Sequence, residues 1–216
     1  MQPIAVFDLD GTLVDSAPDL HAALDRLMAS RNLPGFARAE VVGMIGDGAK
    51  VLVERALAAR GKAFDQPALD VFLEDYGRNA AVETAPFQGI REALEELTKA
   101  GWRLAVCTNK PVAPAITLLR ALGLSDHFRT IGGGDSYPTR KPDPAHLLHT
   151  LRDAGGMASH AVMIGDHHND MAAARGAAVP AVFAGWGYGP RSMAAHATVA
   201  ERPADLPAIL ASLRHG

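Results

Sequence analysis

The sequence predicts an α/β fold built on a parallel sheet. Short apolar runs typical of buried strands occur at residues 4–7, 104–107, 161–164 and 180–184. Segments with helical patterning separate these runs, and such alternation favours parallel strands joined by crossover helices. Polar motifs rich in Asp, Thr and Lys follow several of the runs, at the position where open α/β sheets hold their ligands.

The first apolar run leads into two aspartates, Asp8 and Asp10, within a segment Asp-Leu-Asp-Gly-Thr that ends at Thr12. Alternate side chains of a strand share a face, and Gly11 permits a tight turn, so we expect both carboxylates to face one pocket. Such a pair suits one nucleophile and one proton donor. A lone Asp-x-Asp-Gly segment is also typical of a turn that closes an edge strand, and the rest of the chain decides between the two interpretations.

A long helical stretch follows this motif. One helix is expected to begin near Ser16, where Ser16 and Asp19 have the spacing of a capping box, and its apolar face comprises Leu20, Ala23, Leu24, Leu27 and Met28. A parallel crossover needs only about a dozen residues, so the much longer stretch before the second strand indicates an inserted helical domain. We place this domain at residues 16–82 and the main domain at residues 1–15 and 83–216.

The main domain resumes with a helix over residues 89–100, whose apolar side comprises Ile90, Ala93, Leu94 and Leu97. The next strand, at residues 104–107, contains the only cysteine of the chain, Cys107, which is expected to be a small buried hydrophobic residue. Thr108 and Asn109 follow at the carboxyl end of that strand and supply the second polar motif.

Two more polar motifs come later in the chain. Lys141 begins a segment Lys-Pro-Asp-Pro, and Asp166 and Asp170 belong to a segment Gly-Asp-x-x-x-Asp after the apolar run at 161–164. Taken alone, a lysine is usually solvated, and two such aspartates can cap a helix. Four polar motifs in series along one chain indicate a single site instead.

Together these segments resemble the four motifs of the haloacid dehalogenase superfamily: Asp-x-Asp-Gly-Thr, a Ser or Thr, a Lys, and Gly-Asp-x-x-x-Asp. The resemblance covers essentially the whole chain and implies a Rossmann-like core with the inserted helices as a cap. It implies that Asp8 attacks phosphorus and that Asp10 acts first as acid and then as base. The other residues expected to hold the phosphoryl oxygens or the substrate are Thr12, Gly46, Asp47, Thr108, Asn109 and Lys141.

A divalent cation is expected at this site. A phosphate monoester is a dianion near neutral pH, and each unit-charge pair at about 4 Å is worth about 4 kcal/mol at an effective dielectric constant of about 20, so carboxylates alone would repel it. Carboxylate and carbonyl oxygens favour Mg²⁺ over zinc. The resemblance implies as metal ligands Asp8, the carbonyl of Asp10 and Asp166. Asp170, four residues after Asp166 on the same face of a helical turn, completes the predicted metal site, where it is expected to hold a metal-bound water or Lys141.

The expected substrate is a small phosphorylated metabolite. Residues 42–49 and the helix after them are similar to the cap of phosphoglycolate phosphatases, which makes 2-phosphoglycolate the leading substrate. Lys50 and Arg55 are either partners of its carboxylate or solvated helix residues. A sugar phosphomutase or an inorganic pyrophosphatase of the same superfamily is the first alternative, and a non-catalytic phosphate- or metal-binding protein is a remote one. Dehalogenases lack the second aspartate of the first motif, so Asp10 argues for phosphoryl transfer.

His167 and His168 depart from the family pattern, which usually has a small residue after the first acidic position of the last motif. Adjacent residues on a helix point about 100° apart and do not readily share one ion. We therefore expect polar histidines at the rim of the pocket and no transition-metal site.

The bulk properties exclude some classes of protein. The chain has 216 residues, and its 21 basic and 24 acidic residues give a formal net charge of −3, which argues against a nucleic-acid partner. No apolar stretch approaches the roughly 18 residues of a membrane span, and the amino terminus lacks the pattern of a signal peptide. We expect a cytoplasmic enzyme that is a monomer or a homodimer.

Overall fold

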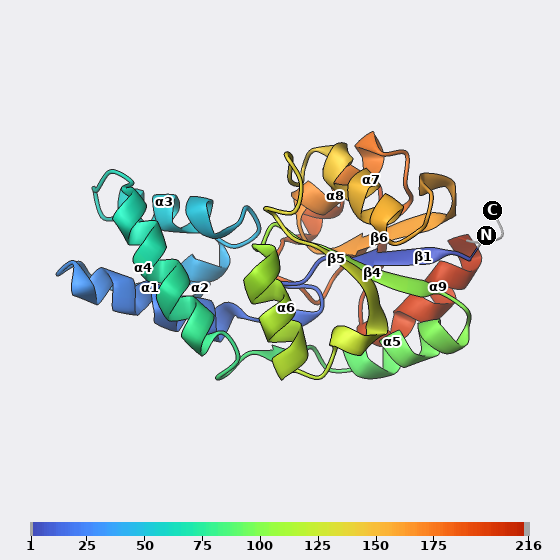
Figure 1. The fold of residues 1–216 in the computed structure, drawn as a ribbon, viewed down its shortest axis with the longest axis horizontal. Coiled ribbons are helices and arrows are strands. Elements are labelled where there is room, and N and C mark those ends of the chain that lie inside the picture. The colour runs from blue at the N-terminus through green and yellow to red at the C-terminus, as the bar shows by residue number, and fades with distance from the viewer. Residues whose placement is uncertain (1, 214–216) are drawn as a thin grey trace.

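A computed structural model describes residues 2–213 of the chain. At its centre lies a parallel sheet with the strand order β5-β4-β1-β6-β7-β8 (Figure 1). The strands are β1 (Ile4–Phe7), β4 (Arg103–Cys107), β5 (Phe128–Gly132), β6 (Ala161–Gly165), β7 (Ala181–Ala184) and β8 (Thr198–Ala200). The α/β prediction is confirmed, and β1, β4, β6 and β7 lie where the apolar runs predicted strands.

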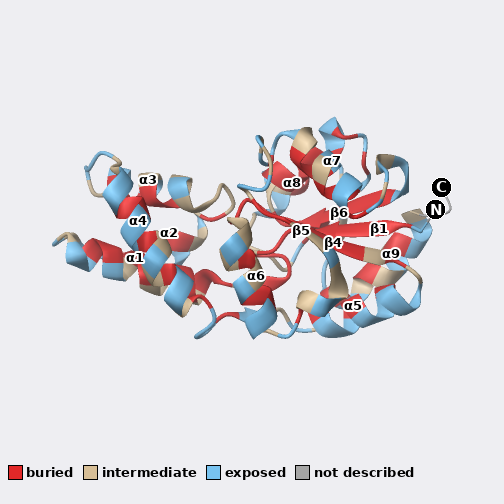
Figure 2. Ribbon diagram, viewed as in Figure 1, coloured by how far each residue is buried: buried red, intermediate tan, exposed pale blue. Residues whose placement is uncertain are grey.

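Helices cover both faces of this sheet (Figure 1). Strand β1 shows why, because its side chains alternate between two hydrophobic clusters and are buried on both sides. Ala5 and Phe7 pack toward α5 (Ile90–Lys99), α6 (Val112–Ala121) and α9 (Leu206–Leu213). Ile4 and Val6 pack toward α7 (Pro144–Asp153) and α8 (His168–Gly176). Figure 2 shows the buried central strands between these partly exposed helices.

Four helices form a separate group beside the carboxyl ends of the strands (Figure 1). They are α1 (Ala17–Ser30), α2 (Arg38–Val42), α3 (Ala49–Ala59) and α4 (Gln66–Asn79), and we call them the helical insertion. The insertion has its own hydrophobic cluster, in which Leu24, Leu57 and Phe72 are fully buried. An inserted helical domain was predicted because the crossover was too long, and the structure confirms it.

Two linkers join the insertion to the sheet domain, and they run side by side. The first linker contains β2 (Val14–Asp15), which pairs antiparallel with β3 (Ala85–Pro86) of the second. Asp19, at the start of α1, accepts hydrogen bonds of 2.7 to 3.1 Å from the second linker. The donors are the backbone N–H groups of Val82, Glu83 and Thr84 and the hydroxyl of Thr84.

The capping box predicted for Ser16 and Asp19 is wrong, although α1 does begin directly after Ser16. Ser16 makes no side-chain capping bond, because its hydroxyl donates to Asp10 Oδ1 at 2.6 Å. Asp19 is likewise engaged by the second linker. Longer-range contacts have displaced a local motif at both positions.

Short 3₁₀ turns complete the described chain at Ser125–His127, Ala158–His160, Arg191–Ala194 and Pro203–Asp205. Within residues 2–213, no helix combines the length and the apolar character that crossing a membrane requires.

Candidate active site

The polar motifs meet at the carboxyl ends of three neighbouring strands. Asp8 directly follows β1, Thr108 follows β4 and Asp166 follows β6. Because β1 lies between β4 and β6, the three side chains converge at one edge of the sheet. This edge is where open α/β sheets bind ligands.

Lys141 joins two of the carboxylates. Its ammonium lies 3.0 Å from Asp8 Oδ1 and 2.6 Å from Asp170 Oδ1, and its side chain is 1% exposed. Burial acts to lower the pKa of Lys141, but the charges of Asp170 and Asp8 outweigh that effect and raise it. Lys141 is therefore a permanent cation beside the predicted nucleophile.

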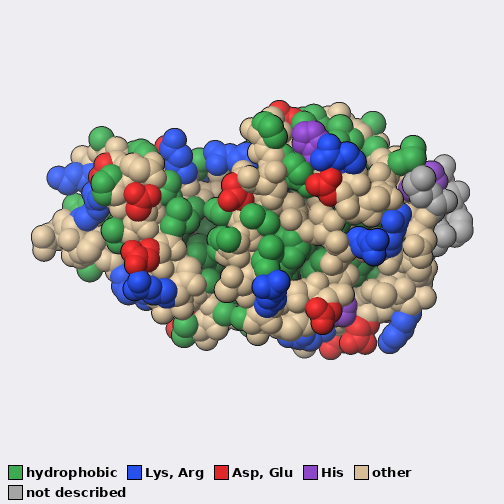
Figure 3. All heavy atoms as spheres, viewed as in Figure 1, with side chains coloured by type: hydrophobic (Ala, Val, Ile, Leu, Met, Phe, Trp, Pro, Cys, Tyr) green, Lys and Arg blue, Asp and Glu red, His purple; other side chains and the backbone are tan. Residues whose placement is uncertain are grey.

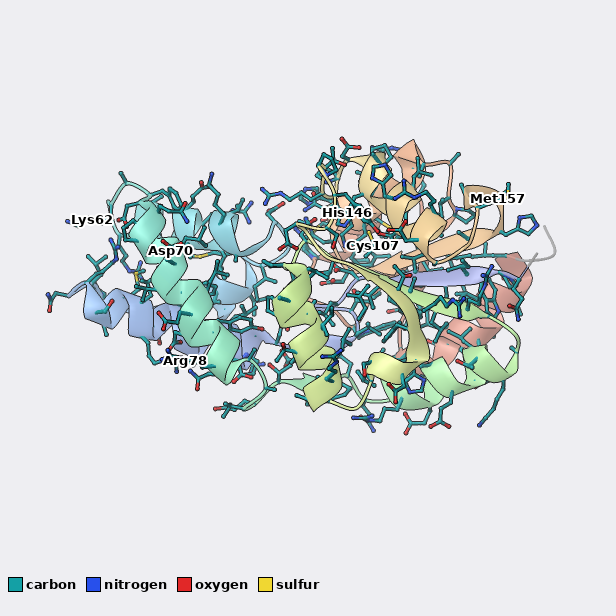
Figure 4. The ribbon with its side chains drawn as sticks, viewed as in Figure 1. Lys62, Asp70, Arg78, Cys107, His146 and Met157 are labelled. Atoms are coloured by element: carbon teal, nitrogen blue, oxygen red, sulfur yellow. The ribbon has the colours of Figure 1, made fainter. Side chains whose placement is uncertain are left out.

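The backbone of Lys141 is also fixed. Its N–H donates to His146 Nδ1 at 3.2 Å, and its carbonyl accepts from Asn109 Nδ2 at 3.0 Å. Figure 4 labels His146, which lies on α7 on the same side of the sheet as Cys107. Burial, with a contribution from the charge of Lys141, lowers the pKa of His146 to about 4, so the ring is neutral and can accept.

Asp166 is held by groups from distant parts of the chain. Its Oδ2 accepts from the N–H groups of Tyr188 at 2.8 Å and Gly189 at 3.3 Å, and its Oδ1 accepts from the Thr12 hydroxyl at 3.0 Å. Burial and then the charge of Asp8 raise the pKa of Asp166 to about 6, although these hydrogen bonds act the other way. Burial also raises the pKa of Asp170, despite its contact with Lys141.

Three residues of the predicted metal site are brought together. Asp8, Asp166 and Asp170 are buried, and each contributes a carboxylate oxygen within 4.8 Å of the others. One ammonium, that of Lys141, contacts two of these three carboxylates, so ionisation of all three leaves an excess of negative charge. A set of hard oxygen donors with excess negative charge fits a divalent cation such as Mg²⁺.

The Asp10 side chain points elsewhere. Its carboxylate accepts from the Ser16 hydroxyl at 2.6 Å and from the Lys110 ammonium, which is 3.1 Å from both oxygens. Only the carbonyl of Asp10 was predicted as a metal ligand, and its side chain was predicted to transfer protons. Lys110 also donates to the hydroxyl of Tyr76, on α4, at 2.7 Å.

Lys110 was not predicted as a site residue. Its side chain is 5% exposed. Burial acts to lower the pKa of Lys110, but the charge of Asp10 outweighs that effect, so the pKa is raised. The one signal in the sequence was its position directly after Thr108 and Asn109.

A cavity lies between the insertion and this edge of the sheet. Asp8, Asp10, Thr108, Asn109 and Lys110 line it from the sheet domain. Its other wall is largely apolar and includes Leu20, Ile45, Leu52, Phe72, Leu73 and Tyr76 from the insertion. Figure 3 shows hydrophobic side chains around a hollow where the two parts meet.

The loop between α2 and α3 docks on the sheet domain. The Gly46 carbonyl accepts from Asn109 Nδ2 at 3.0 Å and from Asn169 Nδ2 at 3.3 Å. Gly46 has a φ of +120°, and a Cβ atom there would lie 2.8 Å from the ring of His167. The insertion is therefore closed over the site, and His167 lies at the contact between the two parts.

Besides Lys141, which lies between Asp8 and Asp170, the predicted substrate-binding residues fall into two groups. Gly46, Thr108 and Asn109 line the cavity, as expected for groups that touch a substrate. Thr12 is fully buried against Asp166, and Asp47 is bound by Arg55 at 2.6 Å and by Asn169 at 2.7 Å.

The cap cations considered for the substrate carboxylate have other partners. Arg55 binds Asp47 and the carbonyl of Met44. The Lys50 ammonium lies 3.7 Å from Glu54 and 5.3 Å from the centre of the Phe64 ring, and its side chain is half exposed. Asp47, His167 and His168 also cluster closely enough to hold a metal ion, but Asp47 already pairs with Arg55.

The sequence matches known proteins over most of its length. The profile of the haloacid dehalogenase-like hydrolase family matches residues 5–184. A phosphoglycolate phosphatase of Mesorhizobium japonicum is 42% identical over 191 residues, which are 87% of this chain and 84% of that protein. A phosphoglycolate phosphatase of Caulobacter vibrioides is 45% identical over 186 residues, covering 84% and 78% of the two chains.

Solved structures share the fold. A predicted phosphoglycolate phosphatase from Haemophilus somnus superposes with a TM-score of 0.89 at 31% identity, covering 96% of this chain and 97% of that one. CbbY from Rhodobacter sphaeroides, solved in complex with phosphate, superposes with a TM-score of 0.82 at 25% identity, covering 95% and 96%. Both similarities extend across the sheet domain and the helical insertion.

Proposed function

Because the chain belongs to the haloacid dehalogenase-like hydrolase family and is a phosphoric monoester hydrolase, we propose that it hydrolyses 2-phosphoglycolate to glycolate and phosphate. One observation carries the proposal: Asp8 and Asp10 face a small cavity whose wall on the insertion side is largely apolar. Such a wall offers few partners for the hydroxyl groups of a sugar phosphate, so it favours a short substrate.

The contacts of Asp8 select its reacting atom. The Leu9 N–H, at 2.7 Å, and the Lys141 ammonium, at 3.0 Å, both contact Asp8 Oδ1. Oδ2 is left to attack phosphorus, forming an aspartyl-phosphate as the bond to the alkyl oxygen breaks. Asp8, Asp166 and Asp170, with the carbonyl of Asp10, would hold Mg²⁺, which supplies positive charge against the phosphate dianion.

Asp10 handles the proton in both steps. It gives a proton to the leaving alkoxide and then takes one from the water that attacks the aspartyl-phosphate, so that the enzyme is regenerated. Its hydrogen bond from Ser16 and its contact with Lys110 hold the carboxyl group at the cavity. Thr108 and Asn109 line the same cavity and would contact the transferring oxygens.

We further propose that residues 16–82 are a cap that opens to admit substrate and closes to exclude water. The direct bonds from Asn109 and Asn169 to the Gly46 carbonyl support this role, because they hold the loop over the site in the closed arrangement. Arg55 and Asn169 keep Asp47 beside that loop.

The test is phosphate release by the purified protein from 2-phosphoglycolate, hexose phosphates, nucleotides and pyrophosphate, with Mg²⁺ and with a chelator. We expect kcat/KM for 2-phosphoglycolate to exceed the others by about tenfold or more, with no turnover in chelator. A higher kcat/KM for pyrophosphate or a hexose phosphate would contradict the substrate, and formation of a phosphorylated sugar product would indicate a mutase. Absence of turnover on every ester would indicate a non-catalytic binding protein.

A further inference from the structure

Lys110 and Tyr76 meet inside the active-site cavity although they come from different parts of the molecule. Lys110 follows β4 in the sheet domain, and Tyr76 lies on α4 of the insertion. The Lys110 ammonium is 2.7 Å from the Tyr76 hydroxyl and 4.4 Å from the centre of its ring. Among the described residues that line the cavity, Lys110 carries the one positive charge.

The hydrogen-bond donors of this pair are not all used. The Tyr76 hydroxyl accepts a bond from Lys110, and within residues 2–213 its own proton has no acceptor. Tyr76 is 3% exposed, so solvent does not readily supply that acceptor. A buried donor without a partner costs free energy, and a ligand oxygen that accepts from it recovers that cost.

We propose that Lys110 and Tyr76 form the subsite that binds the carboxylate of the substrate. This inference rests on the proposed function, since it concerns the non-reacting end of 2-phosphoglycolate. A carboxylate placed there accepts from the ammonium of Lys110 and from the hydroxyl of Tyr76, two donors that lie side by side.

The position of Lys110 fits the length of this substrate. Lys110 contacts Asp10, the group that delivers a proton to the ester oxygen. In 2-phosphoglycolate a single methylene separates that oxygen from the carboxylate, so a cation beside Asp10 is within reach of it. While Asp10 carries the proton for the leaving group, the substrate carboxylate is the anion that balances Lys110.

The other cations that could bind the substrate carboxylate lie outside the cavity lining and have partners of their own. Lys141 lies between Asp8 and Asp170, on the phosphate side of the site. Arg55 binds Asp47, and Lys50 lies beside Glu54 on the half-exposed surface of α3. The subsite therefore accounts for recognition of a carboxylate without any rearrangement of the closed insertion.

The experiment compares two esters that differ in the charged group. These are 2-phosphoglycolate and 2-hydroxyethyl phosphate, in which a neutral hydroxymethyl group replaces the carboxylate. The measured quantity is the ratio of their kcat/KM values, which cancels any loss common to both. The variants are Lys110→Met, which removes the ammonium and keeps an unbranched side chain of similar length, and Tyr76→Phe, which removes one hydroxyl. The control is Lys62→Met on the exposed far end of the insertion (Figure 4).

We expect Lys110→Met to reduce the preference for 2-phosphoglycolate by about ten- to a hundredfold and Tyr76→Phe to reduce it by about two- to tenfold. Lys62→Met should keep the wild-type ratio. A folded Lys110→Met variant with an unchanged ratio would overturn the subsite, even if its turnover of both esters fell. If Lys110→Met does not fold, an unchanged kcat/KM ratio of the two esters in Tyr76→Phe would overturn the subsite.

The outcomes separate this inference from the proposed function. If the wild-type protein releases phosphate from neither ester with Mg²⁺, the proposed function is wrong. If it hydrolyses both and Lys110→Met leaves their ratio unchanged, the subsite alone is wrong.

Discussion

Within residues 2–213, both groups that contact the Asp8 carboxylate lie at the same oxygen, Oδ1. We predict that Asp8→Asn lowers kcat by at least about a thousandfold, since an amide is a poor nucleophile for phosphorus. The fold should persist, because the two side chains are nearly isosteric and the amide oxygen can still accept from Leu9. Steady-state phosphate release and circular dichroism measure the two effects.

Deamidation back to aspartate is the main artefact of this experiment, and mass spectrometry of the assayed sample controls for it. Substantial turnover by a sample free of aspartate would show that another group attacks phosphorus.

For individual residues, short sequence motifs predicted much of the candidate site. Asp8, Thr108 and Asp166 follow strands directly, so their convergence could be expected from strand positions alone. Lys110 could not be recognised, because its partners Asp10 and Tyr76 are 100 and 34 residues away in sequence. The contact with Asp10 depends on the pairing of β1 with β4, and the contact with Tyr76 depends on the packing of the insertion. A local pattern reveals neither.

The loop at Gly46 links the helical insertion to the catalytic edge of the sheet. We predict that Gly46→Ala lowers kcat/KM by about tenfold or more. The residue has a φ of +120°, which disfavours alanine, and the new Cβ atom would lie 2.8 Å from the His167 ring. The loop would then dock less closely, and water exclusion would suffer.

Gly77→Ala is the matched control for this substitution. Gly77 lies within α4, and among the described residues a Cβ atom there meets nothing within 4 Å besides its chain neighbours and the backbone of its own helix. We expect unchanged kinetics and equal or slightly higher stability, because alanine favours a helix. Equal kcat/KM for Gly46→Ala and wild type would show that close docking of this loop is not needed.

The strands that sequence predicted differ in position from those that it missed. β1, β4, β6 and β7 have neighbours on both sides, and their runs are apolar. β5 and β8 are the two edges of the sheet, and their sequences, Phe-Arg-Thr-Ile-Gly and Thr-Val-Ala, include polar and partly exposed residues. An edge strand is partly solvated, so its composition resembles that of a loop.

For the whole molecule, the buried carboxylates link stability to pH and to metal. Burial raises the pKa of Asp166 to about 6, above the value of about 3.9 expected in an unfolded chain. The folded, metal-free protein therefore favours the protonated form of Asp166. The stability that this preference contributes is fully present below about pH 4 and is lost as the pH rises through about 6. Two pKa units correspond to a free energy on the order of 3 kcal/mol.

We predict that, in chelator, the Tm of the protein is lower at pH 7.5 than at pH 5, and that Mg²⁺ raises the Tm more at pH 7.5, because the ionised carboxylates bind it. Thermal unfolding at both pH values measures this, and Asp166→Asn is the control because it removes one titrating group. An identical pH dependence in that variant and in wild type would contradict the assignment to Asp166.

The bonds from Val82, Glu83 and Thr84 to Asp19 have a consequence for the modularity of the chain. Asp19 and Thr84 are 65 residues apart in sequence, yet they lie in contact. Seen from the sheet domain, the insertion is a closed loop whose ends nearly coincide, and the entropy of closing a loop grows only slowly with its length. Helices of different number or sequence can therefore be exchanged at this position without changing the register of the strands. The residues that the insertion contributes to the cavity, Tyr76 among them, can then change while the groups at the sheet edge stay the same.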